Sequence, residues 1–111
     1  MNSNVDFSTA QLLKEKGYTA SHTNYSNKYF NEQGDYKENE CKLQLLKTDF
    51  EVPTITEVIT WLYKKRGIWI EVYYNNNEKE FHVIFNYEKH TFKTPREAYL
   101  SAIKYHLSKI D

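Results

Sequence analysis

The side chains best suited to catalysis or metal binding in this sequence are four histidines and a single cysteine. They are His22, His82, His90, His106 and Cys41. No two histidines have the i, i+4 spacing of a helix-borne metal site, and none forms a metal-binding sequence motif with the cysteine or with a carboxylate. The cysteine is interpreted as a small strand residue, because no general base can be placed beside it. The three glycines are scattered, which excludes a phosphate-cradling loop. We therefore expect a chain without catalytic residues, metal or cofactor.

A binding surface is the more specific expectation, and it arises from residues 68–87. Apolar side chains at alternate positions over Ile68–Tyr74 and Phe81–Tyr87 predict two antiparallel strands. If the numbers of paired positions sum to 155, every apolar position lies on one face, and a slip of one residue would divide the set. The opposite face is too polar for a core and too aromatic for ordinary solvent exposure. This candidate binding face comprises Trp69, Glu71, Tyr73, His82, Ile84 and Asn86.

Three interpretations of the candidate binding face stay open at this point. The first hairpin or the N-terminal helix covers it, or it binds a protein partner or a second copy of the chain, or it stacks nucleic-acid bases. Trp and Tyr suit a protein interface because they combine a large contact area with a polar tip. An enzyme with a scattered site around His82 and Glu71 is the least favoured alternative, because no nucleophile–base or metal arrangement is readable.

A candidate basic patch, Lys64, Lys65 and Arg66, lies at the end of a predicted helix. These side chains could contact phosphates, but the helix dipole already accounts for three cations at a helix C-terminus. The chain carries 15 basic and 15 acidic side chains, a formal net charge of zero. That balance argues against attachment to nucleic acid by bulk electrostatics. A protein partner or a homodimer is therefore favoured over nucleic acid.

The elements of the first half are read from caps, glycines and periodicity. Residues 1–7 are polar and are expected to form a disordered tail. Ser8 begins a capping box and a helix over about 8–16, and Gly17 stands where a terminating glycine belongs. A hairpin is predicted over roughly 24–46, with turn residues in its middle.

The elements of the second half carry stronger signals. A capping box of Thr54 with Glu57 starts an amphipathic helix of about 12 residues, and Gly67 ends it. After the hairpin described above, a third capping box begins at Thr94 and has proline at the first helical position. It predicts a last helix over about 95–109 with apolar residues at helical spacing.

Together these elements predict a small α+β protein. A short strand around Thr91–Lys93 is expected between the second hairpin and the last helix. The order is then α–(ββ)–α–ββ(β)–α, an antiparallel sheet packed with two or three helices. No linker or low-complexity tract divides the chain, so residues 8–111 are expected to form a single domain.

Three blocks of the sequence are distinctive as strings. They cover Leu12–Tyr18, Pro53–Val72 and Thr94–Tyr99, and read LLKEKGY, PTITEVITWLYKKRGIWIEV and TPREAY. With these blocks the chain resembles a family of small uncharacterised proteins encoded in phages, prophages and mobile elements of Bacteroides and related gut bacteria. The resemblance spans most of the chain and is weakest over residues 19–50. It implies a bacterial cytoplasmic setting and a phage or prophage origin, and it supplies no activity.

The sequence therefore leads to a binding protein as its functional hypothesis. The N-terminus lacks the regions of a signal peptide, and no apolar run approaches the length of a membrane span, so a soluble cytoplasmic protein is expected. We expect a non-enzymatic interaction module that binds a protein partner or itself through Trp69 and Tyr73, with His82 and Asn86 at the rim. The alternative is a protein that binds single-stranded nucleic acid or a nucleotide and uses the basic patch for phosphates.

Overall fold

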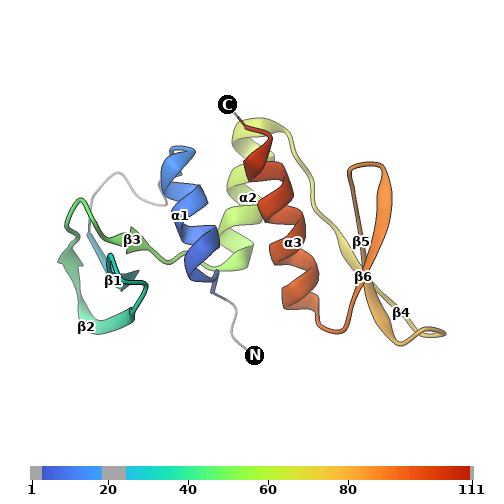
Figure 1. Ribbon diagram of the computed structural model, residues 1–111, viewed down its shortest axis with the longest axis horizontal. Coiled ribbons are helices and arrows are strands. Elements are labelled where there is room, and N and C mark those ends of the chain that lie inside the picture. Colours follow the sequence, from blue (N-terminus) through green and yellow to red (C-terminus); the bar gives the residue numbers. More distant parts are fainter. Residues whose placement is uncertain (1–3, 19–24, 111) are drawn as a thin grey trace.

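The computed structural model describes residues 4–18 and 25–110, and their arrangement is shown in Figure 1. In chain order the elements are α1 (Phe7–Glu15), β1 (Tyr25–Phe30), β2 (Tyr36–Gln44), β3 (Phe50–Glu51), α2 (Ile55–Arg66), β4 (Val72–Asn75), β5 (Glu80–Phe85), β6 (Glu88–Phe92) and α3 (Pro95–Ser108). The predicted α+β class and the predicted order of elements are confirmed.

The molecule is elongated, with principal extents of 46 × 30 × 22 Å. The described helices lie side by side in the middle, and a three-stranded sheet lies at each end (Figure 1). One sheet has the strand order β2-β1-β3, and we call it the first sheet; the other has the order β4-β5-β6, and we call it the second sheet. The strands are thus divided between two sheets, and the first hairpin does not cover the second.

The three described helices run in the same direction (Figure 1). The segments before α1 and α2 are joined by an antiparallel bridge between Asn4 and Thr54. At the other end, the Lys16 ammonium donates to the carbonyl oxygen of Ile110, 2.7 Å away, which ties the end of α1 to the end of α3. This direction follows from the connections, because each helix reaches the next through strands that return the chain to the starting end. The helix dipoles are therefore aligned, and hydroxyl or acidic caps gather at one end of the helices.

The start of α1 differs from the prediction. The carboxylate of Asp6 accepts a hydrogen bond from the backbone N–H of Thr9 at 3.0 Å, so Asp6 is the N-cap and the helix begins at Phe7. The prediction that Ser8 caps this helix is wrong. The Ser8 hydroxyl instead donates to the Asp6 carboxylate at 3.4 Å, because the carboxylate already occupies the capping position.

The caps of the other two helices were predicted more closely. The Thr54 hydroxyl accepts from the Glu57 backbone N–H and the Glu57 carboxylate accepts from the Thr54 backbone N–H, so the capping box of α2 is confirmed. At α3, Thr94 accepts from the Glu97 backbone N–H at 3.2 Å. The Glu97 carboxylate accepts from the Thr94 hydroxyl at 2.9 Å and not from the Thr94 backbone N–H. Only half of the predicted capping box is therefore formed.

Residues 4–7, which were expected to belong to a disordered tail, take part in the fold. The side chain of Val5 is 1% exposed, and its backbone N–H donates to the carbonyl oxygen of Pro53 at 3.1 Å. Burial of this apolar side chain compensates the entropy of ordering the segment. Residues 1–3 of the expected tail lie outside the described residues.

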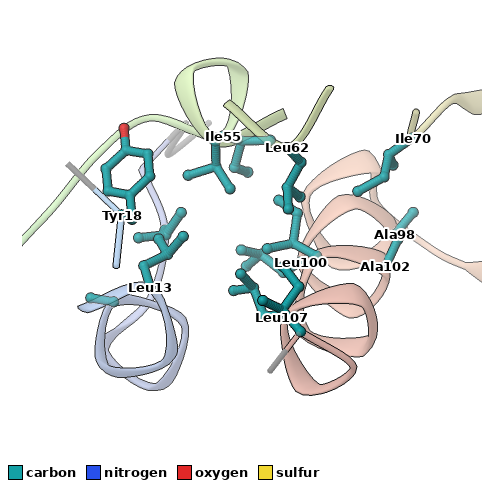
Figure 2. Close-up of a cluster of buried hydrophobic side chains, with 14 of the residues drawn as sticks. Leu13, Tyr18, Ile55, Leu62, Ile70, Ala98, Leu100, Ala102 and Leu107 are labelled. Atoms are coloured by element: carbon teal, nitrogen blue, oxygen red, sulfur yellow. The ribbon is translucent and has the colours of Figure 1, made fainter. Parts of the chain in front are cut away.

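The hydrophobic core fills the space between the helices and reaches the second sheet. Figure 2 shows Leu13, Leu62 and Leu107, one from each helix, converging with other apolar side chains. All three are at most 1% exposed. The core continues to β5, where Val83 is also 1% exposed. The buried faces of the three helices thus form one continuous apolar interior.

The register predicted for the second hairpin is confirmed over its central part. Val72 lies opposite Val83 and Asn75 opposite Glu80, so both pairs sum to 155. The strand β4 begins only at Val72, however, and the chain before it is not paired. The short strand expected around 91–93 is confirmed as the longer β6, which pairs with β5 along its length.

The first sheet meets the helices mainly through aromatic side chains. The ring of Phe7, at the start of α1, lies edge-on to Phe30 of β1 and to Phe50 of β3, with ring centroids 5.4 Å apart in both pairs. The Lys14 ammonium lies 4.7 Å from the centre of the Phe50 ring. The predicted hairpin over 24–46 is confirmed across its described part, in which β1 pairs antiparallel with β2; position 24 lies outside the described residues.

Candidate functional site

The candidate binding face is only partly assembled in the structure. Trp69 is 62% exposed, Ile84 61% and Tyr73 45%, and Glu71 is exposed beside them. Tyr73 and Ile84 point away from the side on which the second sheet packs against α3, because they alternate along β4 and β5 with Val72 and Val83, which face the core. Trp69 and Glu71 lie in the segment before β4, on either side of the buried Ile70. We call the surface made by Trp69, Tyr73 and Ile84 the outer surface.

His82 does not belong to the exposed rim that the sequence suggested. Its residue is 1% exposed, although it lies on the face of β5 turned away from α3. Its partners in the neighbouring strands are Tyr73 and Thr91, and the Tyr73 ring lies edge-on to the imidazole with centroids 5.5 Å apart. The His82 Nε2 atom lies 2.9 Å from a carboxylate oxygen of Glu78. His82 lies in the central strand of the second sheet, and its contacts with the Tyr73 ring and the Glu78 carboxylate give it a structural role.

Contrary to the prediction, Asn86 does not lie on the candidate binding face either. Phe85 pairs with Glu88, so Asn86 and Tyr87 form a two-residue turn, and their φ angles are +56° and +61°. Positive φ at both central residues matches the twist of the flanking strands. The Asn86 side chain accepts a hydrogen bond from the Tyr105 hydroxyl at 3.3 Å. Tyr87, which the alternation placed on the core face, is fully exposed at this turn, because a turn interrupts the period of two.

The candidate basic patch lies next to the outer surface. Lys64, Lys65 and Arg66 occupy the last turn of α2 and are all exposed. Gly67 then takes the left-handed conformation, with φ of +67°, and turns the chain back toward the helix. As a result the ring of Trp69 lies edge-on to the ring of Tyr63, with centroids 5.4 Å apart.

Tyr63 is a surface residue that the sequence analysis did not single out. It is 55% exposed and extends the outer surface onto the helix. The signal that could have found it is the glycine between Tyr63 and Trp69, because a left-handed residue after a helix folds the following side chains back onto the last turn.

The remaining histidines and the cysteine form no common site. The Nε2 atom of His90 lies 3.1 Å from the carbonyl oxygen of Phe85, and its ring stacks on the Phe85 ring at 3.8 Å. Burial lowers the pKa of His106 below its usual value. Cys41 is exposed on β2, and His22 lies outside the described residues. Within residues 4–18 and 25–110, no group of three His, Cys, Asp or Glu side chains could hold a metal ion.

None of the helices in the described part of the chain is long and apolar enough to cross a membrane. A comparison with protein-family models, curated proteins and solved structures finds no match for this chain.

Proposed function

We propose that this chain is a non-enzymatic interaction module of phage or prophage origin that binds a protein partner through its outer surface. The observation that carries the proposal is the exposure of three large apolar side chains, Tyr73 and Ile84 on the second sheet and Trp69 in the segment that leads into β4. Large apolar side chains gathered on one exposed side are typical of interaction sites. The proposed cytoplasmic setting and phage origin rest on the sequence resemblance described above.

The composition of this surface suits a protein interface. Energetically dominant interface residues are enriched in Trp, Tyr and Arg; Trp69 contacts Tyr63, and the exposed Arg66 follows Tyr63 by three positions on α2. The T-shaped contact between the two rings orders Trp69 before binding, so less side-chain entropy is lost when a partner covers it. Glu71 beside Trp69 and Lys89 opposite Ile84 supply a charged rim of both signs, as interface rims commonly have.

A protein partner is favoured over nucleic acid by charge. The chain has a formal net charge of zero, and its three clustered cations stand at the negative end of a helix dipole. A strand of nucleic acid would have to be held by these few side chains. A partner with an apolar patch would instead use the exposed aromatic and aliphatic area that the surface offers.

The test compares capture of host proteins by the wild type and by two variants. The double variant Trp69→Ala with Ile84→Lys removes two of the apolar side chains of the outer surface. Leu43→Ala is the matched control, because Leu43 is an apolar side chain 45% exposed on the first sheet. We expect the wild type and the control to retain the same host protein, and the double variant to bind it more weakly by at least about 30-fold, as loss of a dominant contact implies. Equal capture by all three would contradict the proposal.

The same proteins distinguish the other two interpretations. Sedimentation over a wide concentration range shows whether the partner is a second copy of the chain, in which case dimerisation is lost in the double variant only. Fluorescence anisotropy with labelled single-stranded oligonucleotides, measured across a salt series, tests the nucleic-acid interpretation. Binding that weakens steeply with salt and requires Lys64, Lys65 and Arg66 would replace the protein-binding proposal.

A further inference from the structure

A cavity lies between the first sheet and the N-terminal ends of α1 and α3, apart from the outer surface. It has a volume of about 520 Å³ and opens between the segment before α1, the first sheet and the start of α3. Sites for small molecules in proteins commonly occupy about 300–1,000 Å³, so this cavity is large enough for a small ligand. Its walls are of two chemical kinds.

One wall of the cavity is aromatic. It is formed by Phe7, Phe30 and Tyr36. The Phe30 ring lies edge-on to both neighbours, with centroids 5.4 Å from Phe7 and 5.7 Å from Tyr36. Tyr36 is 43% exposed and stands where the cavity meets solvent. Rings held in this way offer faces and edges against which a flat apolar group can pack.

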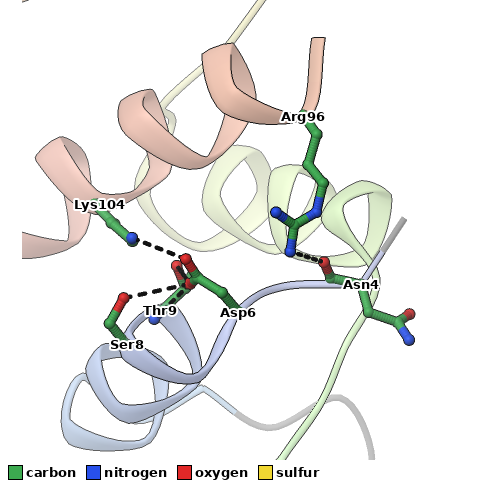
Figure 3. A network of polar contacts seen from close by, with 6 residues as sticks. All are labelled: Asn4, Asp6, Ser8, Thr9, Arg96 and Lys104. Atoms are coloured by element: carbon green, nitrogen blue, oxygen red, sulfur yellow. Dashed lines mark hydrogen bonds and ion pairs between the residues drawn. The ribbon is translucent and has the colours of Figure 1, made fainter. Parts of the chain in front are cut away.

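The other wall is polar and is dominated by Arg96. The Arg96 Nη2 atom donates a long hydrogen bond of 3.3 Å to the carbonyl oxygen of Asn4 (Figure 3). The Arg96 Nε atom is buried and has no hydrogen-bond partner in the described structure. A buried charged donor without a partner is unfavourable, and such groups in native proteins commonly serve a ligand or a bound water.

The nearby carboxylate of Asp6 does not neutralise Arg96. Figure 3 shows it turned toward Ser8, Thr9 and Lys104, and the Lys104 ammonium donates to it at 3.0 Å. Partial burial alone would raise the pKa of Asp6, but the hydrogen bonds from Thr9 and Lys104 outweigh burial and hold this pKa below its usual value. The negative charge of Asp6 is therefore already compensated, and the positive charge of Arg96 has no ion-pair partner among the described residues.

We propose that this cavity binds a small organic anion in which a carboxylate is attached to a flat apolar ring. The Nε–H and Nη2–H groups share one edge of the guanidinium, and this edge matches the two oxygens of a carboxylate. The carboxylate would take the place of the Asn4 carbonyl oxygen, whose hydrogen bond from Nη2 is long. The ring of the ligand packs against Phe30 and Tyr36, away from the charged wall. The site is independent of the outer surface, so it adds a ligand to the proposed interaction module.

The experiment titrates the whole chain with 1-naphthoate and follows it by ¹H–¹⁵N NMR, including the Arg Nε–H signals. We expect saturable binding that shifts the Arg96 Nε–H signal and the amides of residues 4–7 and 30–36. Acetate and 1-naphthalenemethanol each lack one half of the ligand chemistry, and each should bind at least about tenfold more weakly, which corresponds to about 1.4 kcal/mol.

Two pairs of matched variants locate the binding. Arg96→Gln should weaken naphthoate binding at least about tenfold, which corresponds to about 1.4 kcal/mol, whereas Arg66→Gln, at the end of α2, should leave it unchanged. Tyr36→Ala should also weaken binding, whereas Tyr73→Ala, on the outer surface, should not. Equal binding by Arg96→Gln and Arg66→Gln, or shifts confined to the second sheet, would overturn the proposal.

The wild-type titration decides the question if an Arg96 variant fails to fold. Failure of the wild type to bind naphthoate, or saturable binding that leaves the Arg96 Nε–H signal unmoved, would also overturn it. Arg96→Lys adds a further test, because it keeps the charge but removes the two-donor edge, and we expect it to bind as weakly as Arg96→Gln. None of these outcomes depends on the protein partner of the outer surface.

Discussion

The second sheet lies against α3 and shares the main core, whereas the first sheet is attached mainly at its edge. In the second sheet Val83 is buried, and Phe81, Phe85 and Phe92 pack against the core. In the first sheet none of the described side chains is buried. Its anchor is the contact of Phe30 and Phe50 with Phe7.

The two sheets have the same number of strands but different hydrophobic patterns. Phe81, Val83 and Phe85 place apolar side chains at every second position, on one face of β5. Residues 36–44 carry charged and amide side chains on both faces, and β2 shifts its register against β1 between Ser26 and Lys28. Strict alternation fixes both burial and register. The first sheet lacks this alternation. It is held against the helices mainly by the contacts of Phe30 and Phe50 with Phe7, and the cavity lies beside these contacts.

The largest expected effect separates the two sheets by stability. Val83→Ala should lower the free energy of unfolding by about 2 kcal/mol, because it removes buried methyl groups and leaves a cavity. Leu43→Ala, at a 45% exposed position of β2, should change it by less than about 0.5 kcal/mol. Urea unfolding of both variants provides the measurement. Similar losses would show that the first sheet contributes to the core as much as the second.

An intermediate effect tests the attachment of the first sheet to Phe7. Gly34 and Gly17 have φ of +87° and +84°, so alanine at either position should cost about 1 kcal/mol through backbone strain. A β-carbon at Gly34 would also come within 3.0 Å of the Phe7 ring, whereas one at Gly17 meets nothing within 4 Å. Gly34→Ala should therefore be the more destabilising by thermal unfolding. Equal losses of stability would mean that the turn of the first sheet does not pack against Phe7.

The smallest effect concerns the ion pair between Asp6 and Lys104, which joins α1 to α3. Asp6→Asn keeps a good helix cap but removes the charge, and we expect a loss of about 0.5 kcal/mol at neutral pH because both side chains are more than a third exposed.

The pH dependence of this loss has a definite sign. The pKa of Asp6 is lowered in the folded protein from its ordinary value of 3.8, so its contribution is fully present above that value and is lost as the pH falls through the lower folded pKa. Urea unfolding of the wild type and of Asp6→Asn at several pH values should therefore converge in strong acid. A difference that stays constant with pH would show that the charge does not contribute.

Local sequence predicted the helices and the central register well. A cap depends on residues three positions apart, as Thr54 and Glu57 show. The register of β4 against β5 follows from alternation within one hairpin. The same local reasoning failed for Asn86 and Tyr87, where the chain turns without a glycine, and for Asp6, whose carboxylate took the cap expected of Ser8.

The candidate site depended more on contacts that sequence order does not reveal. Trp69, Tyr73 and Ile84 are exposed as their pattern predicted, but the burial of His82 depends on its contacts with Tyr73 and Glu78. The exposure of a polar side chain in a strand depends on the size of the side chains around it, and sequence periodicity does not describe those contacts.

Local sequence patterns are sufficient to predict the α+β class, the order of the elements and the chemical character of each face, because these follow from residues within a few positions of one another. Only the tertiary structure divided the strands between two sheets and aligned the three described helices. It also placed Arg96 against Asn4, which are 92 positions apart, and so created the cavity at the first sheet. Such contacts depend on how distant surfaces pack, and local pattern carries no information about that packing.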